Sequence, residues 1–494
     1  MKLNILFVAS EAAPYAQVGG LGEVMRSLPV ALRGLGHDVR TFIPRYGVMD
    51  TKAFPLELEA SNLKMIAPEL DPNGLLVCNV LKHLDEKGNT LAYFLENMEY
   101  YEKRANVYGY SDDTTRWLLL SRGVLEFIKQ SPWKPDIIVS SDWQTGFVPN
   151  LLATEYQSDP ELSKIATVHT IHNLKHQGMF DQHFISEIEY DSGQGPLPPF
   201  FDKDIWKLNG ARRGILFADV VNTVSPTYAK EIMAKEFGEM LDEVLRERQA
   251  RVFGILNGIN TAMLDPERDA VLAKPFSAGK LRNRVANKTA LQKRLGLTED
   301  DDAFVVAFVG RLDNQKGIDL LQNVAGAMLQ NLATQLIVLG DGNNDDKLYF
   351  QNLQRQHPGK VVAELRFDAD LPRQIFAGAD ALLVPSAFEP CGLVQMEAMR
   401  YGAIPIVRKV GGLADSVADY VPGVGEGTGF VFEKYDHLAL LIAIVRAYET
   451  YKNKKAWSAL VKHAMMADFS WDKSAQEYVI LFKTAVQLHQ QKHS

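Results

Sequence analysis

Residues Ala381–Gly402 read ALLVPSAFEPCGLVQMEAMRYG and combine the end of a strand, an acidic turn and the start of a helix. The apolar run Ala381–Val384 is typical of a parallel strand covered on both faces, and Pro385 ends it. A Pro-Cys-Gly turn then lets the backbone approach a ligand closely, and the residues from Leu393 onward predict a helix. Because a helix N-terminus offers free N–H groups and a positive dipole end, the stretch predicts a sugar-nucleotide site.

Two carboxylates belong to this stretch. Glu389 precedes the expected helix, and Glu397 follows eight positions later, about two helical turns on, so both are expected on one side. An arbitrary acidic pair at this spacing is more often a solvated helix face. The neighbouring strand and glycine turn favour a binding role here.

Length and composition limit the protein class. A chain of 494 residues is too long for one core and predicts two or three domains, while 46% hydrophobic and 23% charged residues are ordinary for a globular protein. A net charge of −8 argues against a general nucleic-acid binder. With Cys78 and Cys391 as the only cysteines, neither a disulfide framework nor a cysteine metal site is expected.

No membrane or export segment is expected. The apolar run Leu438–Val445 is far shorter than the roughly 20 residues that span a bilayer. The run Ile5–Ala9 is too short for a secretory signal and predicts a first strand. We therefore expect a cytoplasmic protein without a transit peptide, with a plastid as the alternative for a plant or algal source.

The order of elements predicts an α/β fold. Short apolar runs alternate with helical stretches, as in parallel sheets, and the series restarts after the turn-rich segment 257–287. We expect two doubly wound, Rossmann-like domains, residues 1–260 and 261–474, that face a deep interdomain cleft at the carboxyl ends of their strands. The predicted strands are Ile5–Ala9, Val39–Ile43, Ile137–Ser140, Ala166–His169, Val220–Val224, Val252–Leu256, Phe304–Val309, Gln335–Leu339, Val361–Phe367, Ala381–Val384 and Ala403–Val407.

Two glycine-rich turns follow expected strands. QVGGLGEV at 17–24 comes after the first strand, and VGGLAD at 410–415 is a second strand-to-helix turn, where Gly411 and Gly412 suit an anion. A glycine-rich turn alone is weak evidence for a ligand site, since tight packing of the backbone also requires glycine. The position of the first turn at the carboxyl end of a strand favours a ligand.

A basic pair lies in VGRLDNQKG at 309–317. Arg311 offers a planar fork and Lys316 a compact charge, which together suit two phosphates without a metal. An exposed basic loop is the commoner origin of such a pair, but its place after the first strand of the second half favours phosphate binding.

Polar residues also follow strands of the first half. In TVHTIHN at 167–173, His169 is expected to be structural, whereas His172 could hydrogen-bond a sugar hydroxyl. The two histidines lack a third and fourth metal ligand, so no metal site is expected. Asp142 in SSDWQTG is a further candidate, with a helix N-cap as the alternative.

Eight ordered motifs together resemble the bacterial glycogen synthases and plant starch synthases, from residue 3 to about residue 475. They are QVGGLGEV, SDWQTG, HTIHNLKHQGMF, NTVSPTYAKEI, GILNGIN, GRLDNQKGIDLL, PSAFEPCGLVQMEAMRYG and VGGLADSV. The resemblance implies a GT-B fold whose C-terminal helix, residues 475–494, crosses back to the N-terminal domain. It also implies transfer of glucose with retention, from ADP-glucose or UDP-glucose to the non-reducing end of an α-1,4-glucan, with no metal or cofactor.

The resemblance assigns roles residue by residue. In the second half it places Arg311 and Lys316 at the diphosphate and Glu389 at the transferred glucose. Glu397 departs from many bacterial glycogen synthases, which lack this second glutamate, and resembles a wider set of retaining GT-B transferases that have it, often near the ribose. Backbone donors come from Cys391, Gly392 and Leu393, while Gly19 and Gly20 approach the phosphates. The sugar and acceptor side is lined by His172, Asn257 and Asp142, and the catalytic set is Arg311, Lys316, Glu389 and His172.

Two positions depart from the family motif Lys-Val-Gly-Gly-Leu-Gly-Asp. Gln17 replaces the lysine and Glu23 the aspartate, both on the acceptor and sugar side. Glutamine keeps an amide donor, so we expect an active enzyme with weakened donor binding.

Retention would ordinarily require a carboxylate nucleophile, and none is evident in the motifs. The resemblance implies that the leaving diphosphate takes the acceptor proton on the same face, so that electrostatic stabilisation dominates catalysis. Two alternatives stay open: a retaining GT-B transferase with a small sugar acceptor, and a silent glucan-binding homologue. The HNLKHQGMF and EPCGLVQ motifs weigh against the first, and the retained charged residues weigh against the second.

Overall fold

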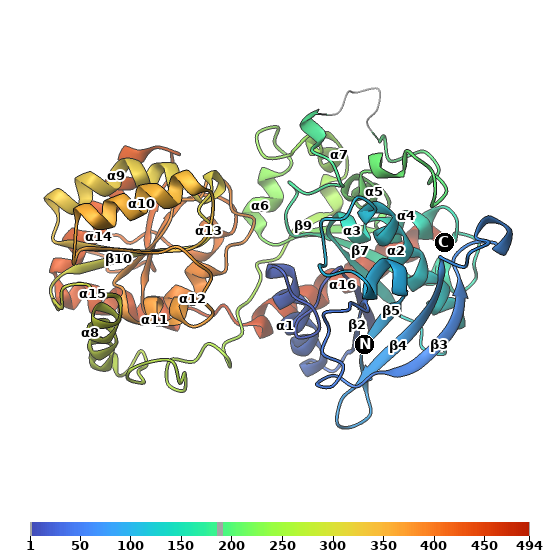
Figure 1. Cartoon of the computed structure of the whole chain (residues 1–494), viewed down its shortest axis with the longest axis horizontal. Helices are drawn as coiled ribbons and strands as arrows, with labels where there is room; N and C mark the ends of the chain where they lie inside the picture. The colour runs from blue at the N-terminus through green and yellow to red at the C-terminus, as the bar shows by residue number, and fades with distance from the viewer. Residues whose placement is uncertain (1, 185–190, 494) are drawn as a thin grey trace. The chain divides into compact units, whose positions relative to one another are not determined.

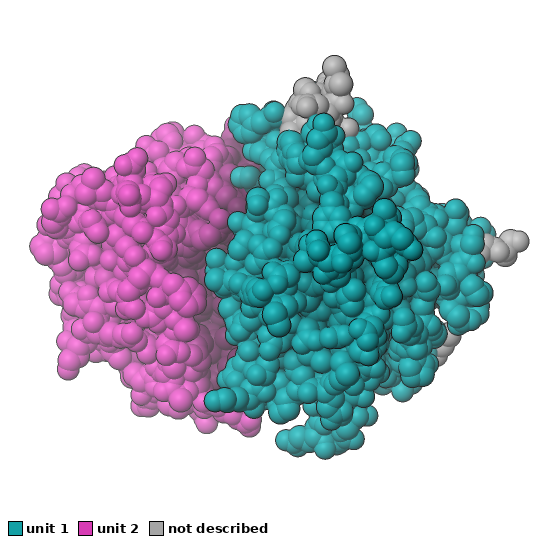
Figure 2. All heavy atoms as spheres, turned by 45° about the vertical axis from the view of Figure 1, so that its right-hand side comes forward, with its two compact units in different colours: residues 1–224, 229–255, 471–494 teal, residues 225–228, 256–470 magenta. Residues whose placement is uncertain are grey.

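The computed structural model describes residues 2–184 and 191–493 and divides into two compact units (Figure 2). Unit 1 comprises residues 1–224, 229–255 and 471–494, and unit 2 comprises residues 225–228 and 256–470. The predicted boundaries after residues 260 and 474 differ from these by a few positions. The sequence did not predict that Ser225–Tyr228 joins the second unit, where Ser225 Oγ donates to the carbonyl oxygen of Pro390 at 2.8 Å.

Unit 1 contains a nine-stranded sheet in the order β3-β4-β5-β2-β1-β6-β7-β8-β9 (Figure 1). Strands β1, β2 and β5 to β9 pair in parallel, whereas β4 pairs antiparallel with both β3 and β5. The strands are β1 (Asn4–Val8), β2 (Asp38–Pro44), β3 (Glu57–Lys64), β4 (Val77–Leu84), β5 (Thr90–Glu96), β6 (Ile137–Ser141), β7 (Ala166–Ile171), β8 (Val220–Thr223) and β9 (Val252–Gly254).

Three strands of this sheet, β3, β4 and β5, were missing from the sequence-based expectation of a purely parallel domain. β3 reads ELEASNLK and exposes most of its side chains, so it lacks the continuous apolar run that marks a strand covered on both faces. The sequence signal of an antiparallel edge is weaker because one of its faces meets water.

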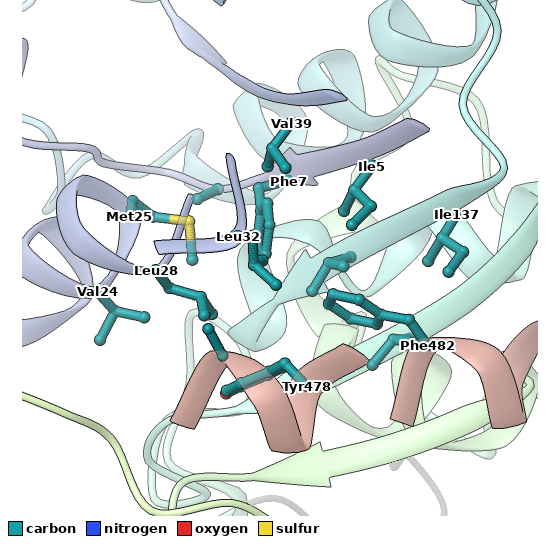
Figure 3. Packing of buried hydrophobic residues seen from close by; sticks show 14 of the residues in the cluster. Ile5, Phe7, Val24, Met25, Leu28, Leu32, Val39, Ile137, Tyr478 and Phe482 are labelled. Atoms are coloured by element: carbon teal, nitrogen blue, oxygen red, sulfur yellow. The ribbon is translucent and has the colours of Figure 1, made fainter. Parts of the chain in front are cut away.

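The core of unit 1 includes the last helix of the chain (Figure 3). Phe7 of β1 meets Phe482 of α16 edge-on, with ring centroids 6.3 Å apart, and Leu28 of α1 packs into the same cluster. Tyr478 of α16 accepts a hydrogen bond at 3.2 Å from the side-chain amide of Asn222. The helices of this part of the chain are α1 (Gly20–Gly34), α2 (Asp113–Gln130), α3 (Asp142–Thr145), α4 (Phe147–Ala153), α5 (Gly210–Phe217), α6 (Pro226–Glu231), α7 (Asp242–Glu247) and α16 (Trp471–His493).

Unit 2 contains a six-stranded parallel sheet in the order β12-β11-β10-β13-β14-β15. Its strands are β10 (Phe304–Val309), β11 (Thr334–Leu339), β12 (Val361–Glu364), β13 (Ala381–Val384), β14 (Ile404–Arg408) and β15 (Phe430–Phe432). The sequence did not predict the three-residue β15. The helices are α8 (Arg284–Leu295), α9 (Ile318–Asn331), α10 (Asn344–Gln356), α11 (Leu371–Gly378), α12 (Val394–Arg400), α13 (Gly411–Ser416), α14 (His437–Lys452) and α15 (Lys454–Met466).

Both sheets have a topological switch point, where successive strands are added on opposite sides of one strand. In unit 1 it lies between β1 and β6, and in unit 2 between β10 and β13. Ligands of open α/β sheets bind in the crevice outside the carboxyl ends of the strands at such points. The loops after these four strands are therefore where a site is expected within each unit.

Across residues 2–184 and 191–493, no helix has the length and apolar character needed to cross a membrane.

Candidate active site

The two loops at the switch point of unit 2 pack directly on each other. Lys316 ends a short 3₁₀ turn after β10, and its N–H donates to Asp313 Oδ1 at 3.0 Å. Gly317 follows with φ 73°, and a Cβ there would lie 2.2 Å from the carbonyl oxygen of Pro385 in the loop after β13. The N–H of Ala387 donates to the carbonyl oxygen of Gln315 at 2.8 Å. Glycine at 317 thus permits the contact that places the basic loop against the acidic turn.

Lys316 and Glu389 form an ion pair at this contact. The Nζ atom of Lys316 lies 2.6 Å from Oε2 of Glu389, and Ser386 Oγ donates to the same oxygen at 2.9 Å. The two side chains are only 22% and 7% exposed. A carboxylate this buried needs a charged partner and a hydrogen-bond donor, and here it has both. The pair therefore fixes the positions of both charges at the switch point of unit 2.

Arg311 lies in the same loop but faces solvent. Its side chain is 65% exposed, with Nη1 2.8 Å from Asp313 Oδ2 and Nη2 donating to Gln315 Oε1 at 2.9 Å. An exposed ion pair of this kind adds little stability. The guanidinium is therefore held near Lys316 without being fully committed to protein partners, as an anion-binding residue requires.

The glycines of α13 pack against the acidic turn. The N–H of Gly412 donates to the carbonyl oxygens of Glu389 and Pro390 at 3.1 and 3.2 Å, and a Cβ on Gly412 would lie 2.1 Å from the carbonyl oxygen of Cys391. Gly411 has φ 44°, and a Cβ there would lie 1.9 Å from the carbonyl oxygen of Glu389. Close packing of two loops accounts for both glycines, and the Gly412 N–H serves the protein backbone.

Helix α12 begins at Val394, with Leu393 as its N-cap, so Glu389 lies in the preceding turn and not on the helix. As the sequence predicted, Glu389 precedes the helix and only Glu397 lies on it, so helical spacing alone does not bring the two carboxylates to one side. Gly392 has φ 69°, and a Cβ there would lie 2.6 Å from the side-chain oxygen of Gln395. This left-handed residue turns the chain from the acidic residue into the helix.

Cys391 and Asn257 meet within unit 2. Burial raises the pKa of the Cys391 thiol to about 12, against the opposing effect of the Asn257 backbone N–H. The thiol is therefore neutral at physiological pH. The sequence analysis placed Asn257 in the first domain. In the structure it belongs to unit 2, because unit 2 begins at Leu256. Its side-chain Oδ1 is buried without a hydrogen-bond partner in the described structure, so it can accept a hydrogen bond from a ligand.

At the switch point of unit 1, the glycine turn is held by a carboxylate that the sequence analysis did not single out. Glu11 is 2% exposed and accepts hydrogen bonds from the N–H groups of Val18 and Gly19, the latter at 3.1 Å from Oε2. Burial raises the pKa of Glu11, although the backbone donors oppose this. The Gly19 N–H is thus occupied in the free protein, whereas Gly20 begins α1 and is exposed. An acidic residue just after the first strand was the available sequence signal.

The two residues that depart from the family motif lie on this turn and on α1. Gln17 is exposed, and its Cγ lies 2.8 Å from where a Cβ on Gly22 would be, so its aliphatic part covers that glycine. Glu23 accepts a hydrogen bond from Ser27 Oγ at 2.7 Å, and its other oxygen lies 3.5 Å from Arg26 Nε. The carboxylate of Glu23 is therefore engaged on its own helix.

Asp142 joins the loops after β6 and β7. Its Oδ1 accepts hydrogen bonds from the N–H groups of His172 and Asn173 at 2.7 and 3.3 Å, and its backbone has φ 54°. The N-cap of α3 is Ser141, which makes no side-chain capping bond, so the N-cap alternative for Asp142 is wrong. A left-handed non-glycine residue at a switch point is the kind of backbone strain that accompanies function.

His172 is neutral and has one unpaired ring nitrogen. Burial lowers its pKa, although the nearby charge of Asp142 opposes this. Its Nε2 atom is buried without a hydrogen-bond partner among the described residues. His169 also has a buried Nε2 without a partner among the described residues, but its side chain is fully buried within β7. Its Nδ1 lies 3.0 Å from Ser140 Oγ, and burial lowers its pKa to about 3. Only His172 therefore offers a nitrogen at the end of the strand for a ligand.

The described residues contain no cluster of three or more His, Cys, Asp or Glu side chains that could hold a metal ion.

Comparison with known protein families matches nearly the whole chain. Residues 4–247 match the family model "Starch synthase catalytic domain", and residues 291–462 match "Glycosyl transferases group 1". The chain is 40% identical over 488 residues to a glycogen synthase of Clostridium perfringens, covering 98% of each protein. It is 39% identical over 494 residues to one of Thermotoga maritima, covering 98% of this chain and 99% of that protein.

Among solved structures, the catalytic domain of starch synthase IV from Arabidopsis thaliana, bound to ADP and acarbose, superposes with a TM-score of 0.83. It is 32% identical, and the match covers 99% of this chain and all of that one. Sucrose-phosphate synthase from Thermosynechococcus elongatus has a TM-score of 0.58 at 19% identity over 98% of both chains, which supports the fold alone. The predicted GT-B fold is confirmed by these neighbours together with the parallel α/β sheet of each unit.

Proposed function

The chain belongs to the glycogen and starch synthase family of glycosyltransferases, and we propose that it transfers glucose from ADP-glucose to the non-reducing end of an α-1,4-glucan with retention of configuration. The observation that carries the proposal is the Lys316–Glu389 ion pair at the switch point of unit 2. The ADP bound to the Arabidopsis starch synthase supports the adenine nucleotide, and UDP-glucose is the alternative donor.

In this proposal unit 2 binds the donor. Lys316 and Arg311 neutralise the diphosphate, Lys316 as a point charge and Arg311 through its planar fork. Glu389, held by Lys316 and Ser386, accepts hydrogen bonds from hydroxyls of the transferred glucose. Backbone groups of Cys391, Gly392 and Leu393 complete the site. Glu397 on α12 and the side-chain oxygen of Asn257 contribute further contacts to the nucleotide sugar.

The arrangement of charges suits a reaction in which the acceptor hydroxyl attacks the anomeric carbon from the face that the diphosphate leaves. The Glu389 carboxylate is paired with an ammonium group and a hydroxyl, which makes it a weak nucleophile. Cleavage of the bond between the anomeric carbon and the diphosphate oxygen places negative charge on the leaving group. Lys316 and Arg311 stabilise that charge, and the departing phosphate oxygen accepts the proton of the acceptor hydroxyl as the new glycosidic bond forms.

In the same proposal unit 1 serves the glucan and the transferred sugar. His172 presents an unpaired Nε2, and Asp142 holds the backbone that carries it. A neutral imidazole can donate to or accept from a sugar hydroxyl. Gly19 and Gly20 approach the phosphates, with Gln17 and Glu23 beside them.

The deciding experiment is a transfer assay with a maltooligosaccharide acceptor and ADP-, UDP- or GDP-glucose. We expect chain extension with ADP-glucose, α-linked product and full activity in EDTA, because Lys316 and Arg311 supply the positive charge. Transfer to a small sugar instead would favour a different retaining GT-B transferase. Binding of glucan without transfer from any donor would favour a silent homologue, and both results would overturn the proposal. We further propose a cytoplasmic location, where nucleotide sugars are made.

A further inference from the structure

An open surface cavity of about 720 Å³ on unit 2 is lined by basic side chains and by no acidic ones. The four cations are Lys280, Arg282, Lys455 and Lys462. The first two belong to the turn before α8 and the last two to α15, and Asn283 and Ser458 add an amide and a hydroxyl. The volume lies within the range typical of small-molecule sites.

The lining of this cavity provides no acidic side chain to pair with these four charges. Residues 271–298 and 450–467, which supply the lining, contain seven and four Lys or Arg residues and no Asp or Glu, in a chain whose net charge is −8. Two of the other basic residues, Arg284 and Lys288, are buried and turn toward Asp380, with Lys288 Nζ 2.8 Å from its carboxylate. The four cavity cations make no ion pair with any residue that the structure describes.

We propose that this cavity binds a compact, multiply charged oxyanion, namely a phosphate group, free or carried by a sugar. Four cations that line one open cavity without an acidic side chain repel each other, and a phosphate relieves that repulsion while accepting hydrogen bonds from lysine and arginine. The net negative charge of the chain and the small extent of the cavity disfavour an extended polyanion such as nucleic acid. This inference is independent of the transfer activity proposed above.

The test is isothermal titration of the full chain with inorganic phosphate, glucose 1-phosphate and glucose at constant ionic strength. The variant Lys455→Glu/Lys462→Glu reverses two cavity charges, and both side chains are exposed, so folding should persist. Lys360→Glu is the matched control, because Lys360 is an exposed lysine of unit 2 outside the cavity. Circular dichroism and the melting temperature verify that each variant is folded.

We expect wild type and Lys360→Glu to bind at least one of the two anions, with affinity at least about tenfold weaker in the double variant. Equal affinity for both anions identifies the phosphate group as the ligand, and tighter binding of glucose 1-phosphate identifies a phosphorylated sugar. No binding of either anion at millimolar concentration overturns the proposal, as does binding that the double variant leaves unchanged. Binding of a short RNA that the double variant abolishes, without phosphate binding, would also overturn it.

Discussion

The Nζ atom of Lys316 lies 2.6 Å from Oε2 of Glu389, although the two residues are 73 positions apart in the sequence. The pair links the loop after β10 to the loop after β13, the two strands at the switch point of unit 2. An approaching phosphate would share the ammonium group with Glu389, and a glucose hydroxyl would share the carboxylate. In the proposed function, this one ion pair would orient both the phosphate and the glucose of the sugar nucleotide.

Removing either cation should therefore slow catalysis strongly. We expect Lys316→Ala and Arg311→Ala each to lower turnover by roughly two orders of magnitude or more, because each removes a charge aimed at the leaving group. Steady-state rates with saturating donor measure this. Lys360→Ala, which removes an exposed lysine elsewhere in unit 2, should leave turnover unchanged. Near-normal turnover in a folded Lys316 or Arg311 variant would remove the assignment of that residue to the diphosphate.

The contact between α13 and the acidic turn should tolerate no side chain. Gly412→Ala places a Cβ 2.1 Å from the carbonyl oxygen of Cys391, so the turn that carries Glu389 must shift, and we expect catalytic efficiency to fall at least about tenfold. Gly326→Ala is the control: it lies on α9 with no atom within 4 Å of the new Cβ. That variant should keep full activity and gain up to about 1 kcal/mol of helix stability. Equal kinetics in both variants would contradict the positioning role of the contact.

Gln17 stands at a position where the resemblance to the synthase motif implies a lysine. We expect Gln17→Lys to raise catalytic efficiency about tenfold with the native donor, since it restores one partly exposed charge beside the glycine turn. Val18→Lys adds the same charge one position later, on a side chain that is 63% exposed, and should have a smaller effect. An increase equal in both variants would indicate general attraction of the donor. No increase in Gln17→Lys would show that the family role of this position does not extend to this chain.

Asp142 combines a left-handed backbone with two hydrogen bonds to the His172 loop. Asparagine tolerates this backbone and keeps an acceptor oxygen, so Asp142→Asn should fold normally, and any loss of its activity reports on the charge. Asp142→Ala loses both hydrogen bonds and strains the backbone, and we expect a destabilisation of about 2 kcal/mol. Thermal unfolding of both variants separates the loss of charge from the loss of backbone support. Identical melting temperatures of Asp142→Asn and Asp142→Ala would contradict the expected destabilisation of the alanine variant.

The packing of α16 against the rest of unit 1 should depend on pH through His489. Its Nδ1 lies 3.0 Å from Asp219 Oδ2 and its Nε2 lies 2.9 Å from the carbonyl oxygen of Ser163. Both partners are acceptors, so both ring nitrogens must donate and the imidazole must be protonated. Burial lowers the pKa of His489, but the hydrogen bond and charge of Asp219 outweigh it, so the pKa is raised. His489 in turn lowers the pKa of Asp219 against the effect of burial.

A raised histidine pKa contributes stability that is fully present below the unfolded value of about 6.5 and is lost as pH rises through the folded value. We expect His489→Gln to lower the melting temperature most near pH 6, with the difference shrinking toward pH 9. The exposed His463 of α15 provides the control, and His463→Gln should show no such trend. A destabilisation in His489→Gln that does not vary with pH would argue against a protonated His489.

The hydrophobic pattern of the sequence determined the strands that are covered on both faces. Val305–Phe308 and Leu382 are buried in a parallel sheet because a continuous apolar run can be satisfied only by burial. Strand β3 exposes most of its side chains and has no such run, whereas β5 contains the buried apolar run Ala92–Leu95, which the sequence analysis did not single out. Glycines and charged residues likewise marked the loops after several strands, and the strand order of each sheet shows which of those loops lie at a switch point.

Only the tertiary structure decided which of those candidates meet. Local sequence cannot pair Lys316 with Glu389, commit the Gly412 N–H to two carbonyl oxygens, or bring Glu11 onto Gly19, because each contact depends on how loops from different strands pack. The same packing places Asn257 in unit 2. It also lets Asp142 accept a hydrogen bond from the His172 N–H instead of capping a helix. Residue type set the available chemistry, while the order of strands in the sheets set which groups could act together.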